Sequence, residues 1–263
     1  FKETFESIVM AFILAFVFRA FVVEAFVIPT GSMAPTLLGQ HADVTCPQCG
    51  YRFSADLQHS SASPVDPEYS LSNVTITCPM CSFPVKSNTQ TQNHPGDRIL
   101  VHKFIYNITE PKRWDVVVFK FPGTPTENYI KRLVALPGDT VKIVDRQLFI
   151  KAEGTNEFEL MDADDSIAFE RMYSFMGGYK GYSHGRPPGF LTNNDDEYLV
   201  PDDHYLMLGD NSESSLDGRF FGAVHRKNLV GTAVMVWWPF SRRWGVVDRA
   251  EPRNFSSPPS SMP

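Results

Sequence analysis

The sequence predicts a mostly β protein with one apolar helix at its N-terminal end and a small inserted module. From residue 96 onward, short runs of β-branched and aromatic residues are separated by Gly-Asp and Pro-Gly turns, which is typical of antiparallel sheets. No segment of any length after residue 40 has the spacing of apolar residues that a helix requires. The chain has 263 residues, 43% of them hydrophobic and 21% charged, so it is long enough to bury one large core or two modest ones.

The charge of the chain argues against a nucleic-acid partner. Its formal net charge is -6 at pH 7, whereas a protein that binds nucleic acid normally presents a basic surface. We therefore expect no nucleic acid among the partners of this chain.

An uninterrupted apolar run from Ile8 to Phe18 predicts a helix over residues 1–20. The run alone would extend roughly 16 Å, which is too short for a hydrocarbon core of about 30 Å. Extended over Lys2 to Ala20, with charged side chains reaching toward lipid headgroups, it would just span a bilayer or would lie in its interface. We favour a membrane anchor, because exposed phenylalanines are costly to leave in water. A buried core helix and a cleavable secretory signal are the alternatives.

A turn of unusual composition follows a predicted strand of β-branched and aromatic residues. Between Pro29 and Leu38, Gly31 permits backbone angles that are closed to other residues, and two prolines restrict the approach and the exit. Such a turn would present the hydroxyl of Ser32 rigidly as a nucleophile. The alternative is that Ser32 caps a short helix that begins near Pro35.

Residues 40–95 form a predicted insertion, because their composition shifts to Ser, Thr, Asn, Gln and His. Two Cys-x-x-Cys motifs repeat within it, and each follows a short β-like run. Their four thiolates predict a structural zinc site like that of a zinc ribbon: Cys46, Cys49, Cys78 and Cys81. Two disulfides are the alternative, which an extracytoplasmic location would favour. No open coordination position is implied, so we expect no catalytic metal, and the partner of the insertion stays unknown.

The rest of the chain predicts a β domain made of residues 21–39 and 96–248. Its strands are expected over residues 97–103, 113–122, 129–141, 204–208 and 230–238. Residues 151–200 are rich in Gly, Asp and Asn and predict a loop-dominated excursion within this domain. Two of its side chains are expected to be solvated: His184 and Arg186. The Ser- and Pro-rich tail over residues 249–263 predicts disorder.

A serine nucleophile needs a general base, and none of the seven histidines lies in a setting that marks it as one. Lysine does the same work if burial among apolar neighbours lowers its pKa from about 10.4 toward roughly 7 to 8. Lys131 is the best placed, since a strand would put it on one face with Tyr129 and Leu133 while Arg132 points to the other face. A solvated surface lysine is the alternative.

Four sequence motifs occur in a fixed order along the chain: Pro29–Leu37, Gly96–Arg98, Tyr129–Asp139 and Gly209–Arg219. The four motifs follow an apolar N-terminal segment, and this ordered set resembles the motif boxes of the bacterial type I signal peptidases. Each motif alone is weak, but the set is highly specific and covers most of the chain outside the insertions. The resemblance implies a coiled antiparallel β-sheet core like that of the signal peptidases.

The resemblance also implies which residues carry the chemistry. Ser32 would be the nucleophile and Lys131 its general base. The backbone amide of Ser32 and the hydroxyl of Thr30 would form the oxyanion hole, where donors aimed at the developing charge contribute several kcal/mol. In the family, substrates carry small residues, typically alanine, at the first and third positions before the cut.

Supporting residues are implied in the last motif. Ser215 would hydrogen-bond and orient Lys131, while Asp217 and Arg219 would form an ion pair near the site. Gly218 stands where the family usually has serine, which puts a local hydrogen bond in doubt. The four-cysteine insertion is absent from most family members, so the resemblance implies no role for it.

These observations predict a membrane-bound serine endopeptidase that removes signal peptides from exported preproteins after small-x-small motifs, without a catalytic cofactor. We expect it at the plasma (inner) membrane, with the catalytic domain on the extracytoplasmic side and the lipid bilayer as a further partner. Two alternatives stay open at this point. One is a self-cleaving repressor-type protease with the same Ser/Lys dyad, and the other is a non-enzymatic, membrane-tethered zinc-ribbon adaptor.

Overall fold

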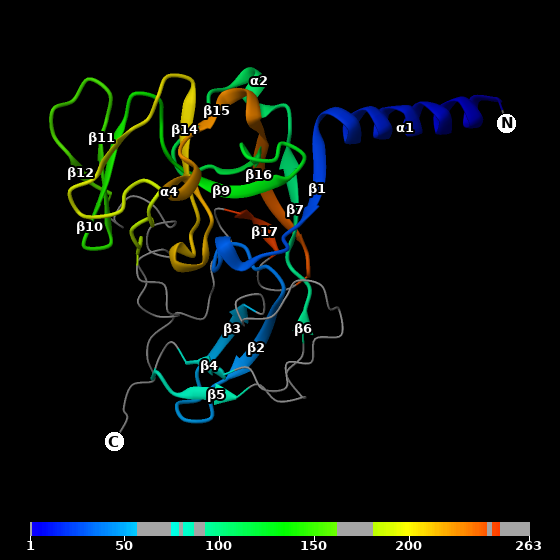
Figure 1. The fold of residues 1–263 in the computed structure, drawn as a ribbon. Coiled ribbons are helices and arrows are strands. Elements are labelled where there is room, and N and C mark those ends of the chain that lie inside the picture. The colour runs from blue at the N-terminus through cyan, green and yellow to red at the C-terminus, as the bar shows by residue number, and fades with distance from the viewer. Residues whose placement is uncertain are drawn as a thin grey trace.

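The computed structural model describes residues 2–56, 75–78, 81–86, 93–161, 181–240 and 244–247. Its main feature is an eight-stranded antiparallel sheet in the order β1-β7-β16-β8-β9-β14-β15, with β17 paired to β16 (Figure 1). The bounds of these strands are β1 Val23–Val27, β7 Arg98–His102, β8 Val116–Lys120, β9 Asn128–Ala135, β14 His204–Leu208, β15 Val224–His225, β16 Leu229–Trp238 and β17 Gly245–Val246. The prediction of a mostly β fold is confirmed.

Strand β16 curls this sheet. It pairs with β7, β8 and β17, and its register shifts against β7 and against β8. Such irregularities bend a strand and increase its twist, so the sheet coils instead of lying flat.

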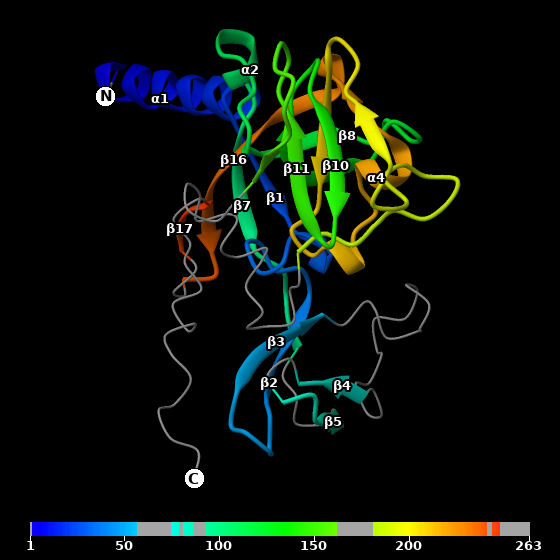
Figure 2. The ribbon, with the colours of Figure 1, turned by 90° about the vertical axis from the view of Figure 1, so that its left-hand side faces the viewer.

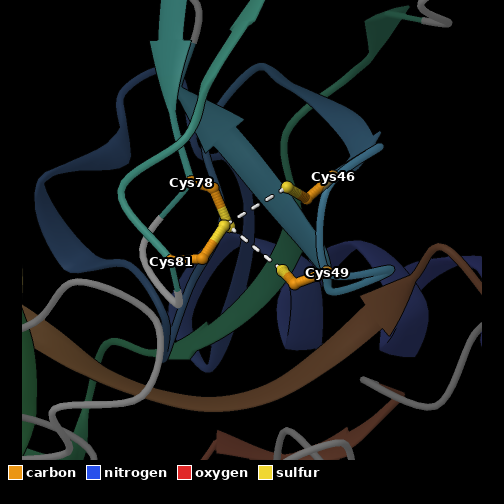
Figure 3. A group of neighbouring side chains, drawn as sticks. All are labelled: Cys46, Cys49, Cys78 and Cys81. Carbon is orange, nitrogen blue, oxygen red and sulfur yellow. Dashed lines mark hydrogen bonds between the residues drawn. The ribbon is translucent and has the colours of Figure 1, made fainter. Parts of the chain in front are cut away.

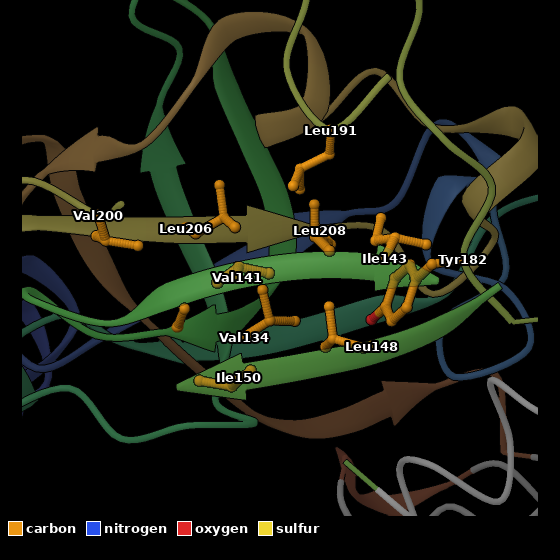
Figure 4. Packing of buried hydrophobic residues seen from close by; sticks show 11 residues of the cluster. Val134, Val141, Ile143, Leu148, Ile150, Tyr182, Leu191, Val200, Leu206 and Leu208 are labelled. Atoms are coloured by element: carbon orange, nitrogen blue, oxygen red, sulfur yellow. The ribbon is translucent and has the colours of Figure 1, made fainter. Parts of the chain in front are cut away.

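A second, four-stranded sheet packs beside the first in the order β12-β11-β10-β13. The bounds of its strands are β10 Thr140–Val144, β11 Gln147–Lys151, β12 Glu159–Leu160 and β13 Glu197–Leu199. Its apolar face meets side chains of β9 and β14 in a core of eleven buried residues, most of them leucine, isoleucine and valine (Figure 4). The end of the first sheet that carries β9 and β14 is therefore rigidly supported.

Strand β9 positions both cationic side chains that the sequence singles out. Val117 of β8 lies opposite Lys131, and Val116 lies opposite Arg132. Because successive side chains point to opposite faces of a strand, the two cations face different sides of the sheet. Both are buried, at 4% and 1% exposure respectively, so the alternative of a solvated lysine at position 131 is wrong.

The N-terminal helix α1 covers Lys2–Phe21 and projects away from the sheet (Figure 1). The side chains described at residues 2–14 and 16 are all exposed, which excludes the alternative of a buried core helix. Several are large and apolar, such as Phe5, Phe12 and Phe16. Within the described residues, no helix combines the length and the apolar character that crossing a membrane requires.

The insertion forms two small sheets at one end of the molecule, below the main sheets in both views (Figures 1 and 2). The first has three strands in the order β3-β2-β6, and the second consists of β4 and β5. Their bounds are β2 His41–Thr45, β3 Arg52–Asp56, β4 Thr75–Thr77, β5 Pro84–Lys86 and β6 Asn93–His94. Both sheets are antiparallel and each contains one hairpin that ends in a Cys-x-x-Cys motif.

The predicted excursion over residues 151–200 contributes more to the fold than its composition indicates. Tyr182 and Leu191 are buried in the core between the two sheets. The expectation that His184 is solvated is wrong, because its ring is half-buried and its Nε2 lies 3.0 Å from the carbonyl oxygen of Ile143. Arg186 is exposed, as expected. Residues 162–180 and the predicted disordered tail lie outside the described residues.

The described helices after residue 40 are single turns, in agreement with the missing helical periodicity. They are the α-helical turns α2 Ile105–Ile108 and α4 Gly218–Phe221 and the 3-10 turns η3 Ser212–Ser214 and η4 Arg226–Asn228. Two of them, η3 and α4, belong to the segment that follows β14 and closes one side of the candidate site.

Candidate active site

The turn that carries Ser32 follows β1 and lies inside the molecule. Ser32 is the middle residue of the 3-10 turn η1 (Gly31–Met33), all of which is buried. Asn211 holds this turn, because its backbone amide donates to the Ser32 carbonyl at 3.0 Å and its side-chain Nδ2 donates to the Gly31 carbonyl at 3.1 Å. Among the described residues no helix begins near Pro35, so the helix-cap hypothesis for Ser32 is wrong.

Ser32 and Lys131 are in direct contact although they are far apart in the sequence. The Nζ of Lys131 lies 2.7 Å from the Oγ of Ser32, and it also donates to the carbonyl of Ile130 at 2.9 Å. Both side chains are almost fully buried. This is the geometry that a nucleophile and its general base require, which is a hydrogen bond of about 2.6–3.2 Å.

Burial lowers the pKa of Lys131 to about 8. Loss of hydration disfavours the charged ammonium and is the largest cause. The carboxylates of Asp217 and Asp210 oppose it by attracting the cation, and the guanidinium of Arg219 adds to it by repulsion. A far larger fraction of Lys131 than of an ordinary lysine is therefore neutral near physiological pH and able to accept a proton.

Thr30 lies at the mouth of the turn. Its Oγ1 is 3.4 Å from the Oγ of Ser32, and the residue is exposed whereas Ser32 is buried. As the residue before η1, Thr30 has extended backbone angles and makes no side-chain capping bond. Its hydroxyl therefore lies next to the Ser32 hydroxyl, on the side where an oxygen that develops charge beside Ser32 would be.

Ser215 lies near the pair but does not contact Lys131 as expected. The Oγ of Ser215 is buried and has no hydrogen-bond partner among the described residues. It packs against Gly209, where an added Cβ would lie 2.1 Å from that oxygen and 2.7 Å from the Ser32 carbonyl oxygen. The expected hydrogen bond to Lys131 is absent, and Lys131 donates to Ser32 and to Ile130.

The ion pair expected between Asp217 and Arg219 is present and buried. Two guanidinium nitrogens of Arg219 donate to the two carboxylate oxygens of Asp217, each at 2.8 Å. The same guanidinium donates to the carbonyls of Ser183 and Ser212 at 2.7 Å. Asp217 also accepts from the backbone amide of Gly209 at 2.9 Å. This network fixes the segment that packs against the nucleophile turn. Its hydrogen bonds offset the free-energy cost of removing both charges from water.

A second buried ion pair was not predicted from the sequence. Arg132 donates to both carboxylate oxygens of Asp210, at 2.8 and 2.6 Å, and to the carbonyl of Trp114 at 2.8 Å. The hydroxyl of Thr36 donates to Asp210 at 2.5 Å. The pair ties β9 to the nucleophile turn, on the face of β9 opposite Lys131. Both residues lie within the sequence motifs. No rule of sequence spacing, however, predicts that Arg132 pairs with Asp210.

The glycine at position 218 fits its surroundings. It is the first residue of α4, after Asp217, whose side chain accepts from the amide of Arg219. A Cβ at Gly218 would lie 2.6 Å from Cδ1 of Leu206 and 2.9 Å from the carbonyl oxygen of Met207. A serine in this place would therefore need a shift of the Met207 backbone, so the departure from the family motif matches the packing of this chain.

The four cysteines meet between the two hairpins of the insertion (Figure 3). All are free thiols, and their four sulfur atoms lie within 4.8 Å of one another. Across the two hairpins, the sulfur of Cys46 lies 3.6 Å from that of Cys81, and the sulfur of Cys49 lies 3.7 Å from that of Cys78. A tetrahedral site with metal–sulfur bonds of about 2.3 Å has sulfur atoms about 3.8 Å apart, whereas a disulfide needs about 2.05 Å. The arrangement therefore fits a single tetrahedral metal ion.

The two cysteine motifs end in turns of the same kind. In each, the amide of the residue after the second cysteine donates 2.9 Å to the carbonyl of the first cysteine, and that residue has a positive φ, 72° at Gly50 and 58° at Ser82. Each motif therefore closes in a tight turn of the same kind. The match between two motifs in separate hairpins indicates that both are built to hold the same kind of ligand.

The fold and the site define a class, a mostly β protein in which a serine and a lysine touch inside a coiled sheet. The chain belongs to the family described as "Signal peptidase, peptidase S26", which it matches over residues 1–55 and 71–238. It is 35% identical over 170 residues to signal peptidase I of Pseudomonas fluorescens, and this alignment covers 55% of this chain and 60% of that protein. It is 28% identical over 253 residues to signal peptidase I of Rickettsia typhi (strain ATCC VR-144 / Wilmington), which covers 92% of this chain and 82% of that protein.

These matches confirm the resemblance that the four motifs indicated. The chain spans about 60% of the length of its relatives from Pseudomonas fluorescens and Pseudomonas aeruginosa. The matched segments include all four motifs and also both cysteine motifs.

Proposed function

We propose that this chain is a serine endopeptidase that cleaves signal peptides from exported preproteins after small-x-small motifs. The observation that carries the proposal is the 2.7 Å contact between the Ser32 hydroxyl and the buried amine of Lys131. Family membership and relatives named signal peptidase I support the substrate class. An adaptor in which these residues were incidental would have no reason to bury a lysine against a serine, since an unpaired lysine is costly to bury.

The first half of the reaction would transfer the signal peptide to Ser32. The neutral amine of Lys131 takes the hydroxyl proton as the Ser32 oxygen attacks the scissile carbonyl carbon. The oxyanion that forms accepts hydrogen bonds from the Thr30 hydroxyl and the Ser32 backbone amide. The ammonium of Lys131 then gives its proton to the amide nitrogen, the C–N bond breaks, and the mature protein leaves with a free amino terminus.

The second half would return the enzyme to its starting state. A water molecule gives a proton to the neutral Lys131 and adds its oxygen to the ester carbonyl. The tetrahedral intermediate collapses, the ester bond to Ser32 breaks, and the serine oxygen takes the proton back from Lys131. The signal peptide leaves as a carboxylic acid. In this scheme the side chains and water carry out every step, without a metal or organic cofactor.

The pH dependence of cleavage tests this role of Lys131. Because the reaction needs the neutral amine and burial sets its pKa at about 8, kcat/KM should rise with pH through about 8 and level off above it. Below that pKa the rate should fall about tenfold for each pH unit. The measurement is kcat/KM for a peptide without titratable groups near the cut, from pH 6 to pH 10. A limb near about 6.5, the usual pKa of histidine, would show that another group is the base.

We extend the proposal to the membrane, because an aromatic edge lies beside the strands that lead into the site. This edge consists of Trp238, Phe240 and Trp244, whose successive ring centroids are 5.2 and 6.4 Å apart, and Phe240 is 74% exposed. The guanidinium of Arg98 lies 5.9 Å from the centre of the Trp238 ring. Exposed aromatic rings beside a cation are typical of side chains at a lipid interface.

The chain that leads into the site runs past this edge. Val27, the last residue of β1, is exposed, and its register partner Arg98 pairs in turn with Trp238 of β16. Contact of the aromatic edge and of α1 with a plasma membrane, with the catalytic domain on the extracytoplasmic side, would bring Ser32 to substrates that are themselves held in the bilayer. The exposed apolar side chains of α1 support its role as the membrane-binding segment.

Replacing two members of the aromatic edge should weaken membrane binding. The double variant Phe240→Ser/Trp244→Ser removes two large apolar side chains, each worth about 1.5–3 kcal/mol when buried, so the partition coefficient should fall at least about tenfold. The measurement is sedimentation with vesicles of phosphatidylethanolamine and phosphatidylglycerol. Leu199→Ser is the matched control, because Leu199 is an exposed apolar residue on β13 of the second sheet. Equal losses in both variants would refute the role of the edge.

We also assign the four cysteines to one structural zinc ion in a ribbon formed by residues 40–95. The sulfur spacing, the matched turns and the free thiols support this assignment over two disulfides. With four thiolates around it, the ion would have no open position for a substrate or for water, so its contribution would be structural. Metal binding by a small module of this kind is coupled to its folding.

A further inference from the structure

A short stem joins the cysteine ribbon to the nucleophile turn. The stem consists of residues 38–42 and 93–97, the two chain segments that enter and leave the insertion. Two hydrogen bonds clamp its base, because the Leu38 amide donates to Oδ2 of Asp97 at 2.8 Å and the Asp97 amide donates to the Leu38 carbonyl at 2.9 Å. The Asp97 carbonyl in turn accepts from the amide of Ile28 at 2.8 Å. The base of the ribbon is therefore bonded to the strand that leads into the turn.

Two glycines let the stem pack directly on the backbone of that turn. A Cβ at Gly39 would lie 2.2 Å from the carbonyl carbon of Thr30, and a Cβ at Gly96 would lie 1.8 Å from the carbonyl oxygen of Ile28. Neither position has room for any side chain. The backbone of the residue proposed for the oxyanion hole is thus in contact with the stem, without an intervening side chain that would absorb a displacement.

One strand connects the metal ligands to this contact. The Gln40 amide donates to the carbonyl of Pro29 at 3.2 Å, β2 (His41–Thr45) begins at the next residue, and Cys46 follows it directly. A strand held at both ends transmits a change at one end to the other. The position of Cys46 and the position of the turn are therefore linked by a continuous piece of sheet.

The far end of the ribbon depends on the four sulfurs. In the described part of the chain, the hairpin β4–β5 pairs with no other strand, and β2 pairs only with β3 and β6. The two hairpins meet in a small cluster of buried side chains, two of which are ligands: Val44, Cys46, Ala55, Cys78 and Val85. A hairpin of such short strands is not stable alone in water, so a bound ion would be the main link between the two halves.

We propose that metal bound by the four cysteines stiffens the stem and thereby holds Ser32 at its reacting distance from Lys131. This inference rests on the proposed function and assigns to the ribbon a positioning role in the same reaction. Gly39, Gln40 and Asp97 touch the turn but not the reacting atoms, so they are positioning residues. A displacement of about 1 Å at a nucleophile costs on the order of 10²-fold in rate. Metal loss should therefore lower kcat more than it raises KM.

The test compares the zinc-loaded chain with metal-free chain and with the Cys78→Ser/Cys81→Ser variant. The first readout is metal content, with cobalt substitution to show the charge-transfer and d–d bands of a tetrahedral thiolate site. The second is amide hydrogen exchange in residues 28–42, with β14 as the internal control for global folding. The third is kcat and KM for a small-x-small peptide.

We expect one zinc ion per chain and, on its removal, faster exchange in residues 28–42 with unchanged protection of β14. The value of kcat should fall at least about tenfold while KM stays within about twofold, and added zinc should restore both exchange and kcat to the metal-free protein. Failure to bind zinc, or unchanged exchange and kcat without it, would overturn the inference. Because metal content and exchange are also measurable in Ser32→Ala, the inference and the proposed function can fail separately.

A second variant tests the contact without touching the metal. Gly39→Ala forces a Cβ against the Thr30 backbone, so the zinc-loaded variant should lose kcat as metal-free protein does while its zinc content stays at one per chain. Gly123→Ala is the control, because the nearest atoms to its Cβ belong to the movable ring of Phe121. A Gly39→Ala variant with normal kcat and intact β14 would contradict the proposed link.

Discussion

Replacing Lys131 with methionine is expected to lower kcat/KM for a small-x-small peptide by about 10⁴-fold or more. Methionine fills a similar volume but has no amine to take the proton of Ser32, which lies 2.7 Å from Nζ in the wild-type chain. Ser32→Ala should cost as much, and the double variant no more than either single one, because the two residues act as one unit. The measurement is steady-state cleavage of the peptide in detergent.

Stability separates this effect from a failure to fold. Lys131 is buried without a carboxylate within bonding distance, so Lys131→Met removes a group that is costly to bury and should leave the free energy of unfolding unchanged or raised. Lys120→Met is the matched control, since Lys120 is an exposed lysine at the end of the neighbouring strand β8 and should retain full activity. Substantial cleavage by Lys131→Met at any pH would remove the lysine from the mechanism.

The largest expected loss of stability follows from Asp210→Asn. The change leaves the guanidinium of Arg132 buried at 1% exposure without its counter-charge, and breaking a buried pair in this way typically costs about 3–5 kcal/mol. The carboxylate of Asp210 also raises the pKa of Lys131, so its removal should move the acid limb of the pH profile to lower pH. Urea unfolding measures the first effect and the pH profile of kcat/KM measures the second.

An exposed ion pair in the same region provides the control for this experiment. Glu213 pairs with Arg146 at 2.6 Å, but both side chains are well exposed, so Glu213→Gln should cost no more than about 1 kcal/mol. The double variant Arg132→Met/Asp210→Leu should recover most of the stability lost in Asp210→Asn, because it removes both charges together. If Asp210→Asn lowered the free energy of unfolding as little as Glu213→Gln does, the buried pair would contribute little to the stability of the fold.

Local patterns in the sequence were sufficient for the strands, whereas the pairing of Ser32 with Lys131 followed from the resemblance of four ordered motifs to a family. Strand β9 was predictable because aromatic and aliphatic residues are enriched in it and a Pro-Gly turn follows it, and the two-residue period of a strand separates Lys131 from Arg132. The two Cys-x-x-Cys motifs predicted a common site, and their sulfurs do come together. Such features depend on spacing within a short segment, which a sequence displays directly.

The contacts that hold the site depend on long-range packing and were not predictable from spacing. Ser183 belongs to a segment expected to be a loop-dominated excursion, yet its carbonyl and hydroxyl both accept from the buried guanidinium of Arg219. Asn211 lies within the last motif, but its hydrogen bonds to the backbone of η1 depend on how β14 ends beside that turn. The hydrogen bond expected between Ser215 and Lys131 is absent, since a family motif fixes the identity of a residue and not the direction of its hydroxyl.

The most direct test of the central claim is the cleavage of one peptide with a single Ala-x-Ala motif by the wild-type chain and by Ser32→Ala, with products identified by mass spectrometry. The account predicts one cut, directly after the second alanine, at a rate that rises with pH through about 8 in the wild type. It predicts no product above background with Ser32→Ala. Equal cleavage by the two proteins, or no cleavage by the folded wild type at any pH from 7 to 10, would contradict it.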